Sequence, residues 1–101
     1  MELNIKENTA QKAVIALCGD LDTAASQQFA TEIEPFIADA GKEIIVDFNA
    51  LEYISSAGMR TILQLNKNAI IKGGKVTITG MSEDIRQLFQ MTGFDKMLTI
   101  L

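Results

Sequence analysis

The feature that most limits the folds open to this chain is an alternation between two hydrophobic periods. Apolar residues occupy every second position from Val14 to Cys18, which is the spacing of a half-buried strand. From Phe29 to Ala40 they recur at intervals of three and four, which is the spacing of one helix face. The alternation continues, and we expect the order strand, strand, helix, strand, helix, strand, helix, strand. This order predicts an α/β fold with a mixed, mainly parallel β-sheet and crossover helices.

Turn and cap residues set the expected element boundaries. The polar segment Asn8 to Lys12 predicts a turn, and therefore an antiparallel pair, between the first two strands. The first helix is expected to begin at a Thr23 cap and end at Gly41, with a kink or break at Pro35, because proline lacks a helical donor. The other expected elements are a strand over Glu43–Phe48 buried on both faces, a connection over Asn49–Ile54, a helix from about Ala57 to Lys72 stopped by Gly73-Gly74, a strand at Val76–Ile78, a helix from a Ser82 cap to Gly93, and a strand over Met97–Leu101.

Composition fits one compact domain over residues 1–101. Apolar residues make up 48% of the chain, which is ordinary for a globular fold and too rich for disorder. The net charge is -4, from 13 acidic and 9 basic residues, and the basic residues are scattered, which argues against a nucleic-acid partner. No stretch approaches the ~20 apolar residues that cross a bilayer, so we expect no membrane insertion.

The cysteine content and the first residues indicate the compartment. Cys18 is the single cysteine, so no intrachain disulfide can form, which fits a reducing environment. No basic start is followed by an apolar run, so no signal peptide is expected. We therefore expect a cytoplasmic protein, with Cys18 buried and inert.

The sequence lacks the residue types that most catalytic sites need. Histidine is absent, which argues against Ser-His-Asp and Cys-His nucleophiles and removes the commonest zinc ligand. Gly73-Gly74 has neither the spacing nor the following Lys-Ser/Thr of a phosphate-binding loop. We expect no enzyme activity, no metal and no cofactor. A serine hydrolase that uses Ser56 is the alternative from another class, and the missing histidine disfavours it.

One segment carries a functional signal: Ser55-Ser56-Ala57-Gly58, between an apolar strand and an apolar helix. The simplest interpretation is that one serine is an N-cap, which stabilises a helix by about 1 kcal/mol. The functional interpretation adds that partners of open α/β sheets are met at the carboxyl ends of strands. A helix N-terminus at that edge carries partial positive charge and tolerates a phosphate, so a serine there can be phosphorylated without unravelling the helix.

Five ordered motifs extend this signal over the whole chain. They are Gly19-Asp20-Leu21-Asp22, Ile45-Val46-Asp47-Phe48, Ile54-Ser55-Ser56-Ala57-Gly58-Met59, Gly73-Gly74-Lys75-Val76 and Leu88-Phe89-Gln90-Met91-Thr92-Gly93-Phe94. In this order they resemble the STAS domain, the fold of anti-sigma factor antagonists and of the cytoplasmic tails of sulfate transporters. In the family's usual Asp-Ser-Ser/Thr-Gly loop, the serine two residues before the glycine accepts phosphate. That position corresponds to Ser56, with Ser55 in place of the aspartate and Ala57 in place of the second hydroxyl residue.

The resemblance implies a partner-switching protein without a cofactor of its own. Unmodified, it would bind an anti-sigma factor Ser/Thr kinase of the GHKL type and free a sigma factor; phosphorylation of Ser56 would release the kinase, and a Ser/Thr phosphatase would restore the serine. The residues expected at the partner surface are Asp20, Asp22, Ser55, Ser56, Met59 and Arg60. A plain polar turn for Asp20 and Asp22, a core position for Met59 and a solvated side chain for Arg60 stay open. The alternative within the fold is a STAS subunit that docks on the ATPase of an ABC-type lipid transporter.

Overall fold

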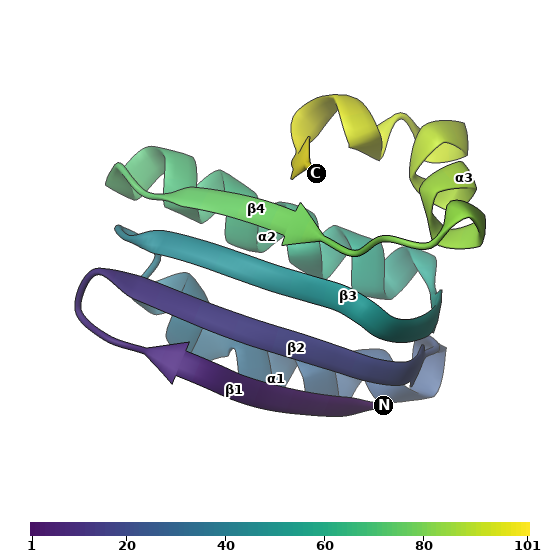
Figure 1. Ribbon diagram of the computed structural model, residues 1–101, viewed down its shortest axis with the longest axis horizontal. Helices are drawn as coiled ribbons and strands as arrows, with labels where there is room; N and C mark the ends of the chain where they lie inside the picture. Colours follow the sequence, from purple (N-terminus) through teal and green to yellow (C-terminus); the bar gives the residue numbers. More distant parts are fainter.

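The computed structural model describes residues 1–101 and contains one five-stranded sheet in the order β1-β2-β3-β4-β5 (Figure 1). Its strands are β1 (Glu2–Asn8), β2 (Lys12–Leu21), β3 (Glu43–Ile54), β4 (Lys75–Thr79) and β5 (Thr99–Ile100). β1 pairs antiparallel with β2, and every other pair of neighbours is parallel. The predicted α/β fold with a mixed, mainly parallel sheet is confirmed.

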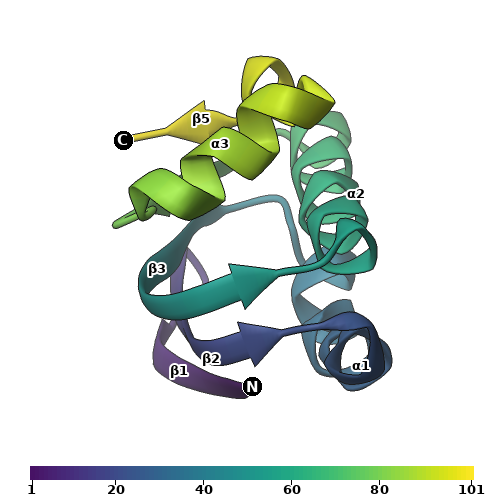
Figure 2. The same cartoon turned by 90° about the vertical axis from the view of Figure 1, so that its right-hand side faces the viewer.

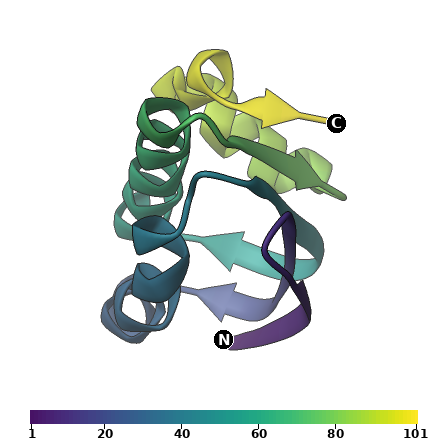
Figure 3. The ribbon, with the colours of Figure 1, turned by 90° about the vertical axis from the view of Figure 1, so that its left-hand side faces the viewer.

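Three α-helices connect the strands: α1 (Thr23–Ala38), α2 (Ser56–Lys72) and α3 (Glu83–Thr92). A short 3₁₀ helix, η1 (Phe94–Met97), precedes β5. The helices α1 and α2 lie side by side on one face of the sheet, whereas α3 packs apart from them, against η1 and β3 (Figures 2 and 3). No helix combines the length and the apolar character that crossing a membrane requires. The predicted order of strands and helices is confirmed.

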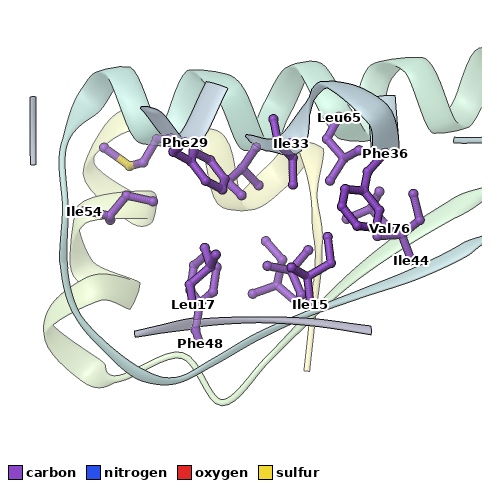
Figure 4. Close-up of a cluster of buried hydrophobic side chains, with 14 of the residues drawn as sticks. Ile15, Leu17, Phe29, Ile33, Phe36, Ile44, Phe48, Ile54, Leu65 and Val76 are labelled. Atoms are coloured by element: carbon purple, nitrogen blue, oxygen red, sulfur yellow. The ribbon is translucent and has the colours of Figure 1, made fainter. Parts of the chain in front are cut away.

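The core lies between the sheet and the two helices that cover it. Along β2, the side chains of Ala13, Ile15 and Leu17 are fully buried and alternate with half-buried neighbours. Side chains from α1, α2 and β3 close over them, as Figure 4 shows for Phe29, Ile33, Phe36, Ile44 and Leu65. Burial of each such large apolar side chain contributes roughly 1.5–3 kcal/mol to folding. The inward face of β2 is therefore Ala13, Ile15 and Leu17, and the alternating set Val14 to Cys18 that the sequence suggested is the half-buried face. Residues 13–18 are all apolar, so the pattern alone could not decide which face turns inward.

Strand β3 is longer than expected. It continues past Phe48 to Ile54, through the segment expected to be a connection. Two register shifts against β2 insert extra residues into β3, and buried positions then fall at Phe48, Leu51 and Ile54, three apart. The period of two is lost there, so the sequence pattern no longer signals a strand. The expected burial on both faces is also wrong, because Ile45 is only half-buried.

Helix α1 differs from expectation at both ends and at its proline. Its N-cap is Asp22 rather than Thr23, and the Asp22 Oδ1 accepts a first-turn N–H at 2.8 Å. The helix ends at Ala38, before Gly41. Pro35 lies inside it without a break. Because Pro35 falls in the last turn, the donor that it lacks costs the helix a single hydrogen bond near an end that frays in any case.

The other predicted end signals are confirmed. Gly73 and Gly93 adopt left-handed conformations, with φ of 84° and 76°, at the ends of α2 and α3. The hydroxyl of Ser82 caps α3 by accepting the N–H of Ile85 at 3.3 Å. Glycine reaches positive φ without steric cost, which explains its place at both helix ends.

One expectation about burial is wrong, because Cys18 is half-buried rather than buried. In the segment Met91 to Phe94, Phe94 packs against the core while Met91 is 82% exposed. The last strand is shorter than expected, because residues 94–97 form η1. Fully buried Phe89 joins α3 to the sheet instead, with its ring centroid 6.2 Å from that of Phe48.

A nearly buried lysine joins two loops at the end of the molecule opposite the α2 N-terminus. Lys42, only 8% exposed, donates from Nζ to Asn8 Oδ1 at 2.7 Å and to the Thr9 carbonyl at 2.8 Å. The same ammonium pairs with Asp39 Oδ2 at 3.1 Å. All three donors of the group are thereby used. The β1–β2 turn is held in this way to the connection between α1 and β3.

We predict that Lys42→Met lowers the free energy of unfolding by about 1.5–3 kcal/mol, because charge-assisted hydrogen bonds are lost and the acceptors at Asn8 and Thr9 are left unpaired. Urea denaturation followed by circular dichroism measures this. The control is Lys75→Met, at an exposed position with no side-chain partner, for which a change within about 0.5 kcal/mol is expected. Equal stability of the two variants would contradict a structural role for Lys42.

Candidate functional site

At one edge of the sheet two strands end and two helices begin side by side (Figure 2). Leu21 and Ile54 are the last residues of β2 and β3 and are register partners. The N–H of Ser55 donates to the Leu21 carbonyl at 2.7 Å, so the pairing extends one residue beyond β3. Asp22 and Ser55 then cap α1 and α2. Carboxyl ends of parallel strands thus meet helix N-termini, the place where open α/β sheets contact ligands and partners.

Ser55 is the N-cap of α2. Its backbone is extended, its Oγ accepts the N–H of Gly58 at 3.1 Å, and its carbonyl accepts the N–H of Met59 at 2.9 Å. The residue is only 5% exposed. The simple N-cap interpretation therefore applies to Ser55, and its expected place at a partner surface is wrong because the hydroxyl is turned inward to the backbone.

Ser56 is the first residue of α2 and is exposed to solvent. Its hydroxyl has no hydrogen-bond partner within the domain. The first turn of α2 contains no acidic side chain, so the partial positive charge of the helix N-terminus is not offset there. The predicted position of Ser56 at the start of the second helix is confirmed, and its side chain is accessible.

Gly58 allows α2 to start directly against the strand ends. A Cβ atom on Gly58 would lie 2.8 Å from Leu21 Cγ and 3.1 Å from Ile54 Cγ1, closer than carbon atoms pack. Any larger residue would push the helix away from the sheet. The glycine thus fixes the position of the Ser56 backbone relative to both strands.

Two aspartates and an arginine lie at the same end of the molecule as Ser56. Asp20 and Asp22 lie at the end of β2 and are exposed, although one oxygen of Asp22 is engaged as the α1 cap. Arg60 is exposed one helical turn after Ser56, and residues four apart share a helix side. The structure therefore brings Asp20, Asp22, Ser56 and Arg60 to the same end of the molecule.

Met59 does not belong to this surface. Its side chain is 3% exposed and part of the hydrophobic core. An expected partner contact by Met59 is corrected in favour of the core position, because the helix side facing the sheet begins with Gly58 and Met59.

No group of three or more Cys, Asp and Glu side chains gathers closely enough to hold a metal ion.

Tyr53 is a surface residue of this edge that the sequence interpretation missed. It is 47% exposed and is the register partner of Asp20. Tyrosine is enriched at protein interfaces because it offers an apolar ring with a polar tip. With residues 49–54 expected to form a connection, the direction of the Tyr53 side chain could not be predicted. The aromatic residue directly before the two serines was the available signal.

Comparisons with known proteins agree with this architecture. The sequence model of the STAS domain matches residues 1–101. The anti-sigma-B factor antagonist of Staphylococcus aureus is 27% identical over 105 residues, covering 99% of this chain and 94% of the relative. Both are similarities over nearly the full length.

Solved structures show the same fold. The phosphorylated form of the Bacillus cell fate determinant SpoIIAA matches with a TM-score of 0.73 at 24% identity, covering 99% of this chain and 91% of that one. An anti-sigma factor antagonist from Mycobacterium paratuberculosis matches with a TM-score of 0.81 at 18% identity, covering 98% and 85%. At these identities the structural likeness concerns the fold.

The two serines are predicted to differ in what they contribute to stability. Ser55→Ala should lower the free energy of unfolding by about 1 kcal/mol, because the Gly58 amide loses its buried cap. Ser56→Ala should change it by less than about 0.5 kcal/mol, because its hydroxyl bonds nothing in the domain. Thermal and urea unfolding of the two variants beside the parent chain measure the difference. A reversed order would mean that Ser56 is the cap.

Proposed function

The chain belongs to the STAS domain family, and we propose that it acts as an anti-sigma factor antagonist switched by phosphorylation of Ser56. In its unmodified form it binds an anti-sigma factor Ser/Thr kinase of the GHKL type. Phosphorylation of Ser56 by that kinase makes the chain release the kinase, and a Ser/Thr phosphatase restores the serine. The chain supplies the phosphate acceptor and the docking surface, while the nucleotide belongs to the kinase.

The observation that carries this proposal is the division between two adjacent serines. Ser55 is buried as a helix cap, whereas Ser56 is exposed with a free hydroxyl at the first position of α2. A kinase needs an accessible hydroxyl on a backbone that stays in place, and Ser56 meets both conditions. The names of the relatives support the same function, since the S. aureus protein is an antagonist of an anti-sigma factor. SpoIIAA, whose fold is similar, is known in phosphorylated and unphosphorylated forms.

The proposed partner surface is revised by the geometry. It comprises the exposed residues around Ser56, namely Asp20, Asp22, Tyr53 and Arg60, and it omits Ser55 and Met59 because both are buried. Tyr53 supplies apolar contact area, and the charged residues supply orientation. Such a mixture of one aromatic residue within a polar rim is typical of transient protein interfaces.

The switch acts through charge at the interface rather than through the fold. A phosphate adds about -1.5 to -2 charge at neutral pH. At the N-terminus of α2 that charge is favourable to the helix, and the Ser55 cap and the Gly58 contact hold the backbone. The cost therefore falls on a partner surface that fitted a neutral hydroxyl. A loss of ~3 kcal/mol in binding weakens the complex more than a hundredfold.

We predict that phosphate transferred by a GHKL-type anti-sigma kinase with ATP is found on Ser56. The kinases of the source genome are incubated with the chain, and mass spectrometry locates the phosphate. Ser56→Ala should abolish the modification. The matched control is Ser55→Gly, since glycine at an N-cap costs only a few tenths of a kcal/mol, and it should remain a substrate.

Stoichiometric phosphate on Ser55, or on Ser56→Ala, would contradict the acceptor assignment. Stable copurification with an ABC-type ATPase, without any phosphorylation, would favour the transporter-subunit alternative.

We predict that Ser56→Glu weakens kinase binding by about 10- to 100-fold while the melting temperature stays equal or rises slightly. The carboxylate is favourable at a helix start by about 0.3–1 kcal/mol, but it is unfavourable in an interface fitted to a hydroxyl. Calorimetric titration and thermal melting of one preparation measure both quantities. Ser56→Gln, of equal size and without charge, is the control. An equal loss of affinity for both variants would show that size, not charge, is the signal.

A further inference from the structure

Helix α2 carries a second surface feature, an open groove of about 640 Å³ between its outer side and η1, which shares only Arg60 with the surface around Ser56. Along α2 the groove is lined by Arg60, Leu63, Lys67 and Ile70, and Met97 of η1 forms the opposite wall. The spacing of three and four places the α2 residues in one stripe. At 1.5 Å per residue the stripe is about 15 Å long, the length of roughly three helical turns.

A hydrogen bond joins the two walls of the groove. Nδ2 of Asn66, a residue that is only 8% exposed, donates to the Met97 carbonyl at 2.8 Å. Asn66 lies in the middle of α2, so the bond fixes η1 beside the stripe. A partner would meet a formed groove and would not have to order one.

The charges of the groove are opposite to those of the chain. Arg60 and Lys67 are exposed, and neither forms an ion pair; the one salt bridge of the domain joins Lys42 and Asp39. No acidic residue lines the groove, although the chain has 13 acidic residues against 9 basic ones. Two positively charged side chains without ion pairs, in an otherwise acidic protein, therefore favour a partner with negative charge at this groove.

The surface between the two cations is apolar. Ile70 is 66% exposed, Met97 is 57% exposed and Leu63 is half-buried. Large apolar side chains left in water at a hollow are typical of an interaction surface. The groove therefore offers an apolar floor with positive charge beside it.

We propose that this groove binds an acidic amphipathic helix of a protein partner. The apolar face of such a helix lies against Leu63, Ile70 and Met97, and its flanking carboxylates meet Arg60 and Lys67, in the helix-in-groove mode of recognition. A second copy of the chain in a two-fold arrangement would bring Arg60 and Lys67 of both copies into one interface without a carboxylate in the groove, and like charges oppose that pairing. An anionic membrane extends well beyond the groove and would meet the net charge of -4, whereas a helix bound in the groove meets chiefly the groove's own cations. The proposal goes beyond the Ser56 switch and does not depend on it.

The test uses a synthetic helical peptide of about 14 residues with leucines along one face and glutamates beside them. The full chain, labelled with ¹⁵N, is titrated with this peptide and with a second peptide in which lysines replace the glutamates. We expect saturable shifts of the groove residues with the acidic peptide only. Ile70→Ser should weaken its binding by at least about fivefold, and Lys67→Glu should shift the preference towards the lysine peptide.

The matched control is Ile71→Ser, which changes the same residue type at the next, similarly exposed position, 72% exposed and outside the groove. It should leave peptide binding unchanged. Equal binding of both peptides, shifts outside the groove, or equal effects of the two isoleucine variants would overturn the proposal. So would self-association that Ile70→Ser abolishes, or binding to phosphatidylserine vesicles with none to the peptide. The titration contains no kinase, so its result is independent of whether Ser56 is phosphorylated.

Discussion

The architecture of the candidate site depends on one close contact, between Gly58 and the side chains of Leu21 and Ile54. Because a Cβ at Gly58 would stand 2.8 Å from Leu21, the first turn of α2 rests directly on the ends of β2 and β3. The hydrogen bond from Ser55 to the Leu21 carbonyl and the Ser55 cap complete the junction. The exposed first turn of α2, with Ser56, is therefore positioned by a small apolar contact beneath it.

Much of the fold could be predicted because local pattern and global packing agree. Strand β2 buries every second residue, as predicted for a half-buried strand, although the buried set is Ala13, Ile15 and Leu17. The glycines at 73 and 93 end helices in the left-handed conformation that favours glycine. Where the two levels disagree, prediction failed. The bulged half of β3 buries every third residue, a period that belongs to neither a strand nor a helix, and so residues 49–54 were expected to be a connection.

The site was predictable in position but not in detail. The Ser-Ser-Ala-Gly segment before an apolar helix located the helix start, yet it did not determine which serine is the cap. That choice depends on whether the strand ends at Ile54, because the residue after the last strand pair has the extended backbone that a cap needs. The same boundary decides that Met59 faces the core and that Tyr53 faces solvent. The orientations of three side chains, Ser55, Met59 and Tyr53, thus depend on where β3 ends, and the sequence pattern did not predict that end.

The exposed, unbonded hydroxyl of Ser56 also bears on how long a signal would last. A group that takes no part in the packing can be modified with little change in the population of unfolded chain, and proteases act on that population. Negative charge at the start of α2 favours the helix, so modified molecules would be degraded no faster than unmodified ones. With Ser56 as the acceptor, the lifetime of each state would then be determined by the enzymes that add and remove the phosphate rather than by loss of the modified protein.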